Sequence, residues 1–440
     1  MAPSGSRPAR RRAALGVTSA LVAASLLAAC GGGSSADTDD QGTDVPHGTI
    51  THLTHVDPST FDDFVAKFKE KYPEVEDVKI ERLTDYATEA KTRMSTDDYG
   101  DVLGIPAGTN NDQLPDFFEP LGTREELSKT YRWLTKTYDG QVYGIADLGN
   151  AQGFLYNKKV WANAGITEFP TTPEEFLDDL QRIKDTQPDV IPFCTNYKDG
   201  WVIGAWEGYR GSVSHDPDYV NKLPEMDAPW SDGHDHEVMD GLLYDIVARG
   251  LIEPDPTTAT YDETKIKIGA GEIATMGVGS WAVARAGKDI AKAGLDPDDL
   301  GYMPFPAQVD GAFYTVTGPD VTLAINKHSQ NKVTARAWLD FLEEEGLSAA
   351  MGGLSPRLDG PVPEQLKDFA DQVALFELAP APVGKESLVN DISTASGIVL
   401  NDGKYRQQII DDARSGARTK QQVFDDLNAA WAKGRAEVLG

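Results

Sequence analysis

The hydrophobic pattern of the first hundred residues predicts strands and helices in alternation. Strands are expected at 49–55, 78–83 and 100–106, with a loop at 108–112 after the third. Between the first two, apolar residues recur at the spacing of one helix face: Phe61, Phe64, Val65, Phe68 and Tyr72. Ser59 or Thr60 can cap this helix, and a proline at position 73 ends it.

The same alternation continues to the end of the chain. A strand at 153–157 precedes the run Thr172-Pro173-Glu174-Glu175, which is typical of a helix start, and a strand at 190–195 follows. Helical periodicity returns in six segments: 238–249, 262–268, 333–345, 363–375, 407–414 and 420–436. No repeat of 20–50 residues is present, so the pattern predicts an α/β chain large enough for two lobes.

The N-terminus has the composition of an export signal. Four arginines up to Arg12 precede an apolar stretch at 13–29, and Cys30 opens a Gly/Ser/Asp-rich segment at 30–47. The run Leu27-Ala28-Ala29-Cys30 resembles the bacterial lipoprotein box, which implies a signal peptide at 1–29 and acylation of Cys30. An ordinary signal peptide that contains a cysteine is the alternative. The segment 30–47 is expected to be a disordered tether.

Charge and cysteine content limit the ligands, membrane contacts and disulfides that the chain can have. The chain carries 41 Lys and Arg against 70 Asp and Glu, a net charge of −29. Such a surface repels nucleic acid and anionic lipid, so neutral or cationic ligands are favoured and a lipid would be the only membrane anchor. With Cys30 acylated, Cys194 has no disulfide partner and is expected to be a small buried residue.

The sequence contains none of the catalytic signatures GxSxG, the Walker loop, HExxH or Cys-x-x-Cys. We therefore expect no enzyme, no cofactor and no bound metal. One cluster, residues 232–237, holds His234 and His236 among carboxylates and could ligate a metal. The alternative is that Asp232 or Asp235 caps a helix that begins near Val238.

The order of several short segments carries a resemblance to a known family. The segments are YDGQVYGI at 138–145, GFLYNK at 153–158, GEIATM at 271–276, GSW at 279–281, GYMPFP at 301–306, LAINK at 323–327, ARAWLDFL at 335–342, GLSP at 353–356 and DDLNAAW at 425–431. In this order and spacing the chain resembles, from residue 48 onward, the extracellular solute-binding proteins of carbohydrate ABC importers. That family includes maltose-binding protein.

The resemblance implies a two-lobed periplasmic-binding-protein fold of type II, with mixed sheets flanked by helices and three crossings between the lobes. We place the crossings near Ala151, Gly279 and Glu345. Lobe 1 would then comprise 48–151 and 280–345, and lobe 2 would comprise 152–279 and 346–440. The resemblance also implies hinge closure over the ligand, with glycines at 149, 153, 277 and 279 available to absorb the change.

A neutral sugar needs an aromatic platform and planar side chains that both donate and accept hydrogen bonds. Trp281 matches the family's sugar-stacking tryptophan; the alternative is that it packs in the core between the lobes. Asn196, Tyr197 and Trp201 match a second wall of the site. Trp206 could belong to the site or to the core.

The first lobe is expected to supply further polar contacts. Asn150 stands at the first crossing, His55 and Asp57 follow the first strand, and Asn110 and Asp112 follow the third. For His55 a solvated position is the alternative, and Asp57 could merely start the turn before the proline at position 58.

The function that the resemblance implies is an extracytoplasmic solute-binding lipoprotein, anchored to the outer face of the bacterial cell membrane. As a monomer it would bind a sugar or oligosaccharide of one to four rings and deliver it to the permease of an ABC importer. Two alternatives stay open: the same fold binding a metal chelate, polyamine or peptide, and a secreted glycoside hydrolase with two carboxylates about 5–10 Å apart.

Overall fold

The computed structural model describes residues 45–440. The expected signal peptide, Cys30 and all of the expected tether except its last three residues lie outside the described residues. No helix of the described part is long and apolar enough to cross a membrane.

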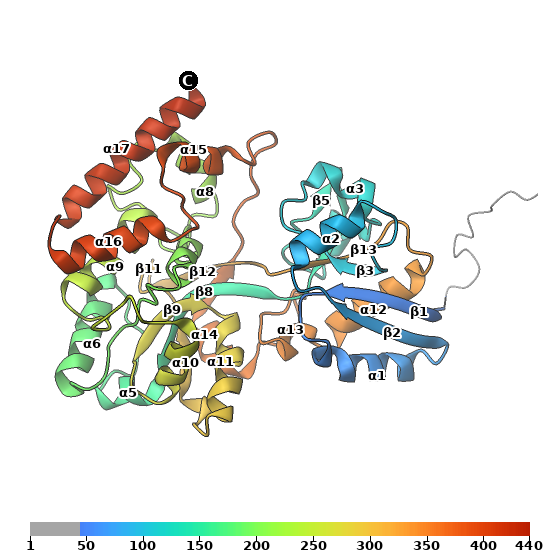
Figure 1. Cartoon of the computed structure of the whole chain (residues 1–440), viewed down its shortest axis with the longest axis horizontal. Helices are drawn as coiled ribbons and strands as arrows, with labels where there is room; N and C mark the ends of the chain where they lie inside the picture. Colours follow the sequence, from blue (N-terminus) through green and yellow to red (C-terminus); the bar gives the residue numbers. More distant parts are fainter. Residues whose placement is uncertain (1–44) are drawn as a thin grey trace, which may run out of the picture. The chain divides into compact units, whose positions relative to one another are not determined.

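The first lobe is built on a five-stranded sheet of order β2-β1-β3-β13-β7. Its strands are β1 (Gly48–Thr54), β2 (Val75–Arg82), β3 (Val102–Gly104), β7 (Ile145–Ala146) and β13 (Thr322–Ile325). β1 pairs in parallel with β2 and β3, whereas β13 is antiparallel to β3 and β7. A small sheet of β4 (Gly122–Thr123), β6 (Gln141–Val142) and β5 (Thr137–Tyr138) accompanies it. Figure 1 shows β1, β2, β3 and β13 together, apart from β8, β9 and β12.

Helices cover both faces of the first sheet. They are η1 (Pro58–Phe61), α1 (Asp62–Lys71), α2 (Tyr86–Met94), η2 (Asn111–Gln113), α3 (Leu114–Phe117), α4 (Arg124–Leu127), α12 (Lys332–Glu344) and α13 (Leu347–Ala350). Side chains of a strand alternate between faces, so Ile50 packs in a core with Phe68 of α1 and Trp338 of α12, whereas Leu53 packs with Met94 of α2. The rings of Phe68 and Trp338 have centroids 5.0 Å apart.

The second lobe is built around β8 (Gly149–Asn157), which pairs antiparallel with three strands. These are β9 (Thr275–Gly279), β10 (Leu300–Met303) and β12 (Ala312–Pro319). β12 also pairs with β11 (Gln308–Val309) and with β14 (Val373–Phe376). Consecutive residues of β8, Phe154 and Leu155, belong to different hydrophobic clusters, so β8 has a packed core on each side.

Helices of the second lobe surround these cores and include the C-terminal segment (Figure 1). They are α5 (Lys158–Asn163), α6 (Pro173–Thr186), α7 (Trp201–Gly204), η3 (Ala205–Tyr209), α8 (Tyr219–Lys222), η4 (Leu223–Glu225), α9 (Asp235–Ala248), α10 (Tyr261–Gly269), α11 (Trp281–Lys292), η5 (Pro297–Asp299), η6 (Glu364–Leu366), α14 (Lys367–Ala370), α15 (Leu388–Ser396), α16 (Lys404–Ser415) and α17 (Lys420–Leu439).

Most expected elements are present, and the exceptions have local causes. Thr172 caps α6 by accepting from the amide of Glu175, as predicted. The segment 363–375 is not one helix, because η6 and α14 occupy only residues 364–370 and the last three residues belong to β14, which pairs in parallel with β12. Pairing within a sheet overrides helical periodicity here. Residues 190–195 form only isolated bridges, and neither Ser59 nor Thr60 caps α1, because the turn η1 precedes it.

The chain passes between the lobes at three connections. The first lies between Ala146 and Gly149, close to the expected position. The second lies between Pro319 and Thr322 and not near Gly279, because β9, β10 and β12 all join the sheet of β8. Residues 280–319 therefore belong to the second lobe.

The third connection lies a few residues beyond Glu345. Leu347 and Met351 pack in the first-lobe core, and Leu354 already bridges to Gly149 of β8. Cys194 is 1% exposed in a second-lobe core, as expected, and burial raises the pKa of its thiol to about 12.

Candidate functional site

Three aromatic side chains of the second lobe lie against one another, and each is the first residue of its helix: Trp201 of α7, Tyr261 of α10 and Trp281 of α11. We call them the aromatic cluster. Ring centroids are 6.0 Å apart for Trp201 and Trp281, 5.2 Å for Trp201 and Tyr261, and 5.8 Å for Tyr261 and Trp281. Trp201 is 43% exposed, which leaves a large apolar ring surface in contact with water.

Backbone features hold the cluster in place. Gly200, with φ of 66°, turns the chain into α7, a conformation that favours glycine. The carboxylate of Asp199 accepts a hydrogen bond from the amide of Tyr261 at 2.6 Å and so ties α7 to α10. A Cβ at Gly279 would lie 2.6 Å from Nε1 of Trp281, so the approach of the indole requires glycine there.

Two arginines, one beside the cluster and one in the first lobe, have side chains without a hydrogen-bonding or ionic partner in the described part of the chain. The guanidinium of Arg285, one turn after Trp281, lies 4.8 Å from the centroid of its ring. The side chain of neither Arg285 nor Arg82, at the end of β2, forms a hydrogen bond or ion pair within residues 45–440. In a chain of net charge −29, such unpaired arginines are available to a ligand.

His55 connects this region electrostatically to the first lobe. Burial lowers the pKa of His55 below its ordinary value, Asp320 opposes the shift, and Arg285 and Arg82 add to it. Its ring lies edge-on to Tyr86, with centroids 5.9 Å apart. The loop after β1 therefore lies within electrostatic range of α11.

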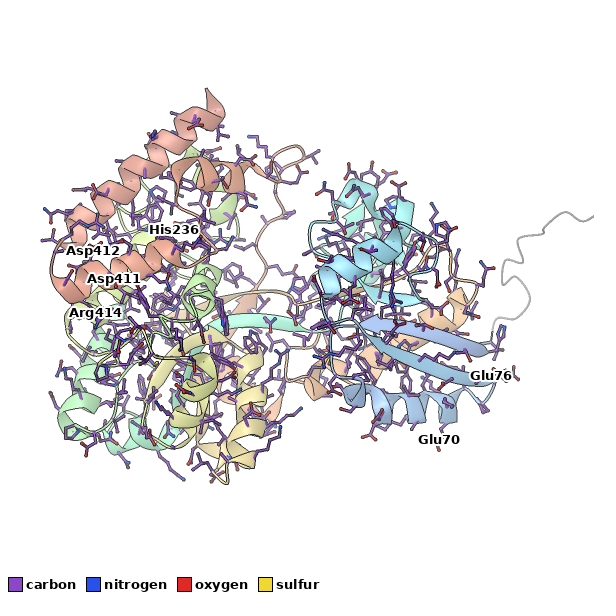
Figure 2. All side chains as sticks on the ribbon, in the orientation of Figure 1. Glu70, Glu76, His236, Asp411, Asp412 and Arg414 are labelled. Carbon is purple, nitrogen blue, oxygen red and sulfur yellow. The ribbon has the colours of Figure 1, made fainter. Side chains whose placement is uncertain are left out.

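Two other residues that the sequence predicted as ligand contacts of the second lobe, Asn196 and Tyr197, are bonded within the protein. Asn196 is fully buried with φ of 52°, its amide donates to the sulfur of Met276, and its Oδ1 has no partner in the described part of the chain. Tyr197 is half-buried and donates from its hydroxyl to Asp411 of α16 at 2.9 Å; Figure 2 labels Asp411 beside Asp412 and Arg414.

Trp206 belongs to the core. It is 3% exposed and packs edge-on against Phe154, Phe193 and Tyr209. Of the two interpretations left open by the sequence, the structure supports core packing, because an indole surrounded by buried rings offers no face to a ligand.

The residues that the sequence predicted as ligand contacts of the first lobe differ in burial and in their partners. Asn150, the second residue of β8, is half-buried with an unpartnered, buried Oδ1. Asp57 is exposed and accepts from the amide and hydroxyl of Ser59, which is the turn-starting role. Asn110 and Asp112 are exposed beside η2, and neither forms a polar or ring contact with the aromatic cluster among the described residues.

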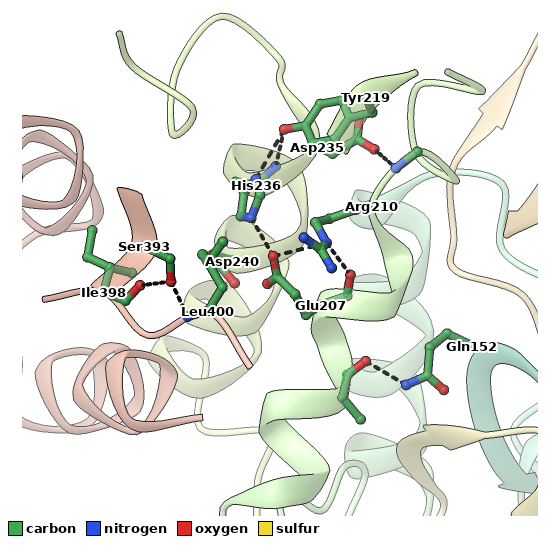
Figure 3. A network of polar contacts seen from close by, with 12 residues as sticks. Gln152, Glu207, Arg210, Tyr219, Asp235, His236, Asp240, Ser393, Ile398 and Leu400 are labelled. Carbon is green, nitrogen blue, oxygen red and sulfur yellow. Dashed lines mark hydrogen bonds and ion pairs between the residues drawn. The ribbon is translucent and has the colours of Figure 1, made fainter. Parts of the chain in front are cut away.

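Of the cluster at 232–237, only His236 is part of a buried ion network among the described residues. His236 contacts Glu207 through Nε2 at 2.9 Å and the hydroxyl of Tyr219 through Nδ1 at 3.1 Å (Figure 3). Arg406 donates to Glu207 at 2.7 Å and to Asp240 at 2.6 Å. We call Glu207, His236, Asp240 and Arg406 the ion network; each is at most 2% exposed.

Neighbouring cationic groups keep Glu207 of the ion network ionised. Burial alone would raise the pKa of Glu207, but Arg210, His236 and Arg406 together hold it well below its usual range. No group of three or more His, Cys, Asp or Glu that could hold a metal occurs in residues 45–440.

The expected cap of the helix after this cluster was also wrong. α9 begins at Asp235, and Asp235 accepts from the amide of Gly211 instead of capping the helix.

Sequence reasoning missed four residues of this region: Tyr261, Arg285, Arg82 and Asp320. Arg285 had a detectable signal, because it lies four residues after Trp281 on a helix, where side chains meet. Tyr261 had none, since its position beside Trp201 depends on the packing of α7 against α10.

Comparison with known proteins agrees with this architecture. The family described as bacterial extracellular solute-binding protein matches residues 54–347. BlMnBP1, a binding protein of an ABC transporter from Bifidobacterium animalis subsp. lactis solved with mannobiose, is 33% identical, covers 91% of this chain and 98% of its own, and superposes with a TM-score of 0.75.

Two further relatives bind other or longer sugars. The manno-oligosaccharide specific protein BlMnBP2 of the same organism, solved with mannotriose, is 32% identical over 91% of this chain and 96% of its own, with a TM-score of 0.73. The diacetylchitobiose binding protein DasA of Streptomyces coelicolor is 27% identical over 365 residues, which span 77% of this chain and 80% of DasA.

Proposed function

Because this chain belongs to the bacterial extracellular solute-binding proteins, we propose that it captures a neutral oligosaccharide outside the cytoplasm and delivers it to the permease of an ABC importer. The first candidates are mannobiose and mannotriose, which occupy relatives that are 33% and 32% identical. DasA makes diacetylchitobiose the next candidate.

The observation that carries the proposal is the aromatic cluster with its exposed Trp201. A sugar ring has an apolar face that stacks on an aromatic ring, and the hydroxyls at its rim need donors and acceptors. Arg285 and the Oδ1 of Asn150 supply a donor group and an acceptor that no side chain of residues 45–440 satisfies. Arg285 lies beside the aromatic surface and Asn150 lies on β8, and a neutral sugar requires such unpaired donors and acceptors.

Binding proceeds in two steps in this proposal. The sugar first stacks on the second lobe at the aromatic cluster, and the lobes then close so that His55 and Arg82 of the first lobe reach its hydroxyls. The permease recognises the closed form, and no bond of the sugar is broken. The protein acts as a monomer, held at the outer face of the membrane by a lipid on Cys30.

The direct test is calorimetric titration of residues 45–440 with mannobiose, mannotriose, diacetylchitobiose, spermidine and Zn²⁺. A sugar at 100 times its dissociation constant should also stabilise the fold by about 2.7 kcal/mol, which is visible as a rise in melting temperature. Binding of spermidine or Zn²⁺ without any sugar, or release of new reducing ends from a sugar, would contradict the proposal.

The site is tested by Trp201→Ala with Tyr138→Ala as its matched control. Trp201 and Tyr138 are 43% and 42% exposed, but Tyr138 lies in the small sheet of the first lobe. We expect Trp201→Ala to weaken sugar binding by about 1–3 kcal/mol, the range found for a nucleobase stacked on one aromatic side chain, and Tyr138→Ala to leave it unchanged. Equal effects of the two variants would remove the cluster from the site.

The anchor is tested separately. Expressed in a bacterial host, the full chain should gain the mass of a lipid and fractionate with membranes, and Cys30→Ser should abolish both. A soluble, unmodified wild-type product would contradict the anchor and leave the sugar site unaffected.

A further inference from the structure

Trp133 leaves the core of its own lobe. It lies between α4 and β5 in the first lobe, where its neighbours Tyr131 and Leu134 pack in the first-lobe core. Trp133 itself packs in a second-lobe core with Leu155 and Phe369 and is 1% exposed. One residue of the first lobe is therefore inserted into the second.

The backbone at Trp133 has a conformation that bulky residues rarely adopt. Its φ is 56°, in the left-handed region that glycine and asparagine favour. A bulky residue in this region is stable only where its surroundings fix it, and such outliers gather at functional positions. The turn directs the indole away from Tyr131 and Leu134 and into the other lobe.

The side chain of Trp133 contacts residues next to the first two connections between the lobes. At the first, the ring lies so close to Gly149 that a Cβ there would come within 1.9 Å of it. Beside the second, Nε1 donates to Oγ1 of Thr317 at 3.0 Å, two residues before β12 ends. The hydroxyl of Thr317 donates in turn to the carbonyl of Phe376, so both of its roles are satisfied.

The chain just after the third connection forms hydrogen bonds with the residues around Trp133. The amide of Arg132 donates to the carbonyl of Pro356 at 2.8 Å, and Tyr131 bridges to Arg357. The amide of Trp133 donates to the carboxylate of Glu377, which follows β14 of the second lobe. Residues next to all three connections therefore contact Trp133 or the two residues before it: Gly149 and Thr317 beside the first two, and Pro356 and Arg357 shortly after the third.

We propose that Trp133 is a positioning residue for ligand binding: it is the pivot about which the lobes rotate, and it sets the angle at which they meet. The proposal rests on the proposed function and deepens it, because lobe closure is the step that Trp133 would control. Any rotation that moved the first lobe away from this point would have to withdraw the indole from a packed core and break its bond to Thr317. A rotation that keeps the indole in place preserves both its core packing and its hydrogen bond to Thr317.

Three variants separate the parts of this pivot. Trp133→Phe keeps a ring but removes the donor to Thr317, Trp133→Ala removes both, and Gly149→Ala adds a methyl group where the ring lies. Trp431→Phe is the matched control, because Trp431 is also 1% exposed and donates from Nε1, to the carbonyl of Met226, but lies in the C-terminal helix α17.

The readout is the distance between two spin labels, one on each lobe. Tyr138→Cys and Val383→Cys place labels at exposed positions, 42% and 97% exposed, of the first and second lobes. Cys194 is buried and its thiol pKa is raised to about 12, so it stays unlabelled. Distances are measured by pulsed electron resonance with and without mannotriose, and affinities by calorimetry.

We expect Trp133→Ala and Gly149→Ala to broaden or shift the distance distribution without ligand and to weaken mannotriose binding by tenfold or more. Trp133→Phe should give an intermediate effect, and it remains informative if Trp133→Ala does not fold. Trp431→Phe should lower the melting temperature and leave the distribution and the affinity unchanged.

Unchanged distributions and affinities in folded Trp133→Phe and Gly149→Ala proteins would overturn the inference and leave Trp133 a core residue. If the wild type bound no sugar, the proposed function would fail. The distributions without ligand would still test the pivot, so the two failures can be told apart.

Discussion

The second lobe contains two clusters of aromatic and charged side chains that are used in opposite ways. In the ion network, Glu207, His236, Asp240 and Arg406 are buried and contact one another at 2.6–2.9 Å. In the aromatic cluster, Trp201 is largely exposed, and nearby Arg285 forms no hydrogen bond or ion pair within the described residues. Both regions contain polar or charged groups that can form hydrogen bonds. In the ion network these groups bond to one another, whereas Arg285 has no such partner among the described residues.

We therefore assign the ion network to the stability of the second lobe and the aromatic cluster to the proposed sugar binding. Buried charges must be paired, because an uncompensated charge in a packed interior costs far more than it gains. The ion network meets this requirement by joining η3, α9 and α16, three segments that are distant in sequence. In the aromatic cluster the ring of Trp201 is 43% exposed, and under the proposed function this surface is what the sugar contacts.

The largest effect is expected from Arg406→Met. The change leaves Glu207 and Asp240 buried with one cationic partner fewer, which should lower the free energy of unfolding by about 3–5 kcal/mol. Urea denaturation measures it. The double variant Glu207→Gln with Arg406→Met should recover part of the loss, because it removes one of the stranded charges. A loss below about 1 kcal/mol, which is the size of an exposed ion pair, would show that the ion network does not stabilise the second lobe.

The next effect separates two tryptophans that the sequence could not distinguish. Trp281→Ala should weaken sugar binding by about 1–3 kcal/mol with a smaller change in stability, because Trp281 is half-buried at the exposed cluster. Trp206→Phe should do the reverse, since its indole is 3% exposed and packed among rings. Calorimetric titration and urea denaturation of both variants check the comparison. Equal loss of affinity in the two would place Trp206 in the site.

The sequence predicted the fold where local patterns agreed with the final packing. The Thr172 cap, the faces of α1 and α12 and the order of family segments were all visible in it. It failed where partners distant in sequence decide the outcome. β14 was expected to be helical, and the second connection was placed near Gly279, because neither pattern reveals that β8 and β12 pair with so many strands.

The candidate site was predicted in part for the same reason. Trp201 and Trp281 were found from their positions in the family's order of segments, and the structure brings them into contact. Tyr261 and Asp320 were missed, since only the packing of separate segments places them there. His236 was weighed as a metal ligand because a sequence shows neighbours along the chain, whereas its partners Glu207 and Tyr219 precede it by 29 and 17 residues.

A smaller effect is expected from Arg285→Ala. A cation–π contact at a solvent-accessible site contributes about 0.5–1 kcal/mol, so removing the exposed guanidinium of Arg285 from above Trp281 should cost little stability. If Arg285 binds sugar hydroxyls, affinity should fall several-fold more than in Arg414→Ala, which removes another exposed arginine that lacks polar partners within residues 45–440. Titration with mannotriose gives both values. Equal affinities would assign Arg285 to the surface of α11 alone.

The smallest effect concerns pH and tests whether His55 of the first lobe takes part. Burial, Arg285 and Arg82 lower the pKa of its imidazole from 6.5, against the opposing influence of Asp320. His55 is therefore neutral at pH 7 and can both donate to and accept from a sugar hydroxyl. Affinity should stay constant between about pH 6.5 and 8.5 and fall only in more acidic solution, where protonation adds a third positive charge beside the two arginines. In His55→Gln the acidic fall should vanish, because glutamine keeps a donor and an acceptor but does not titrate. An acidic fall that persists in His55→Gln would assign the titration to another group and remove His55 from the site.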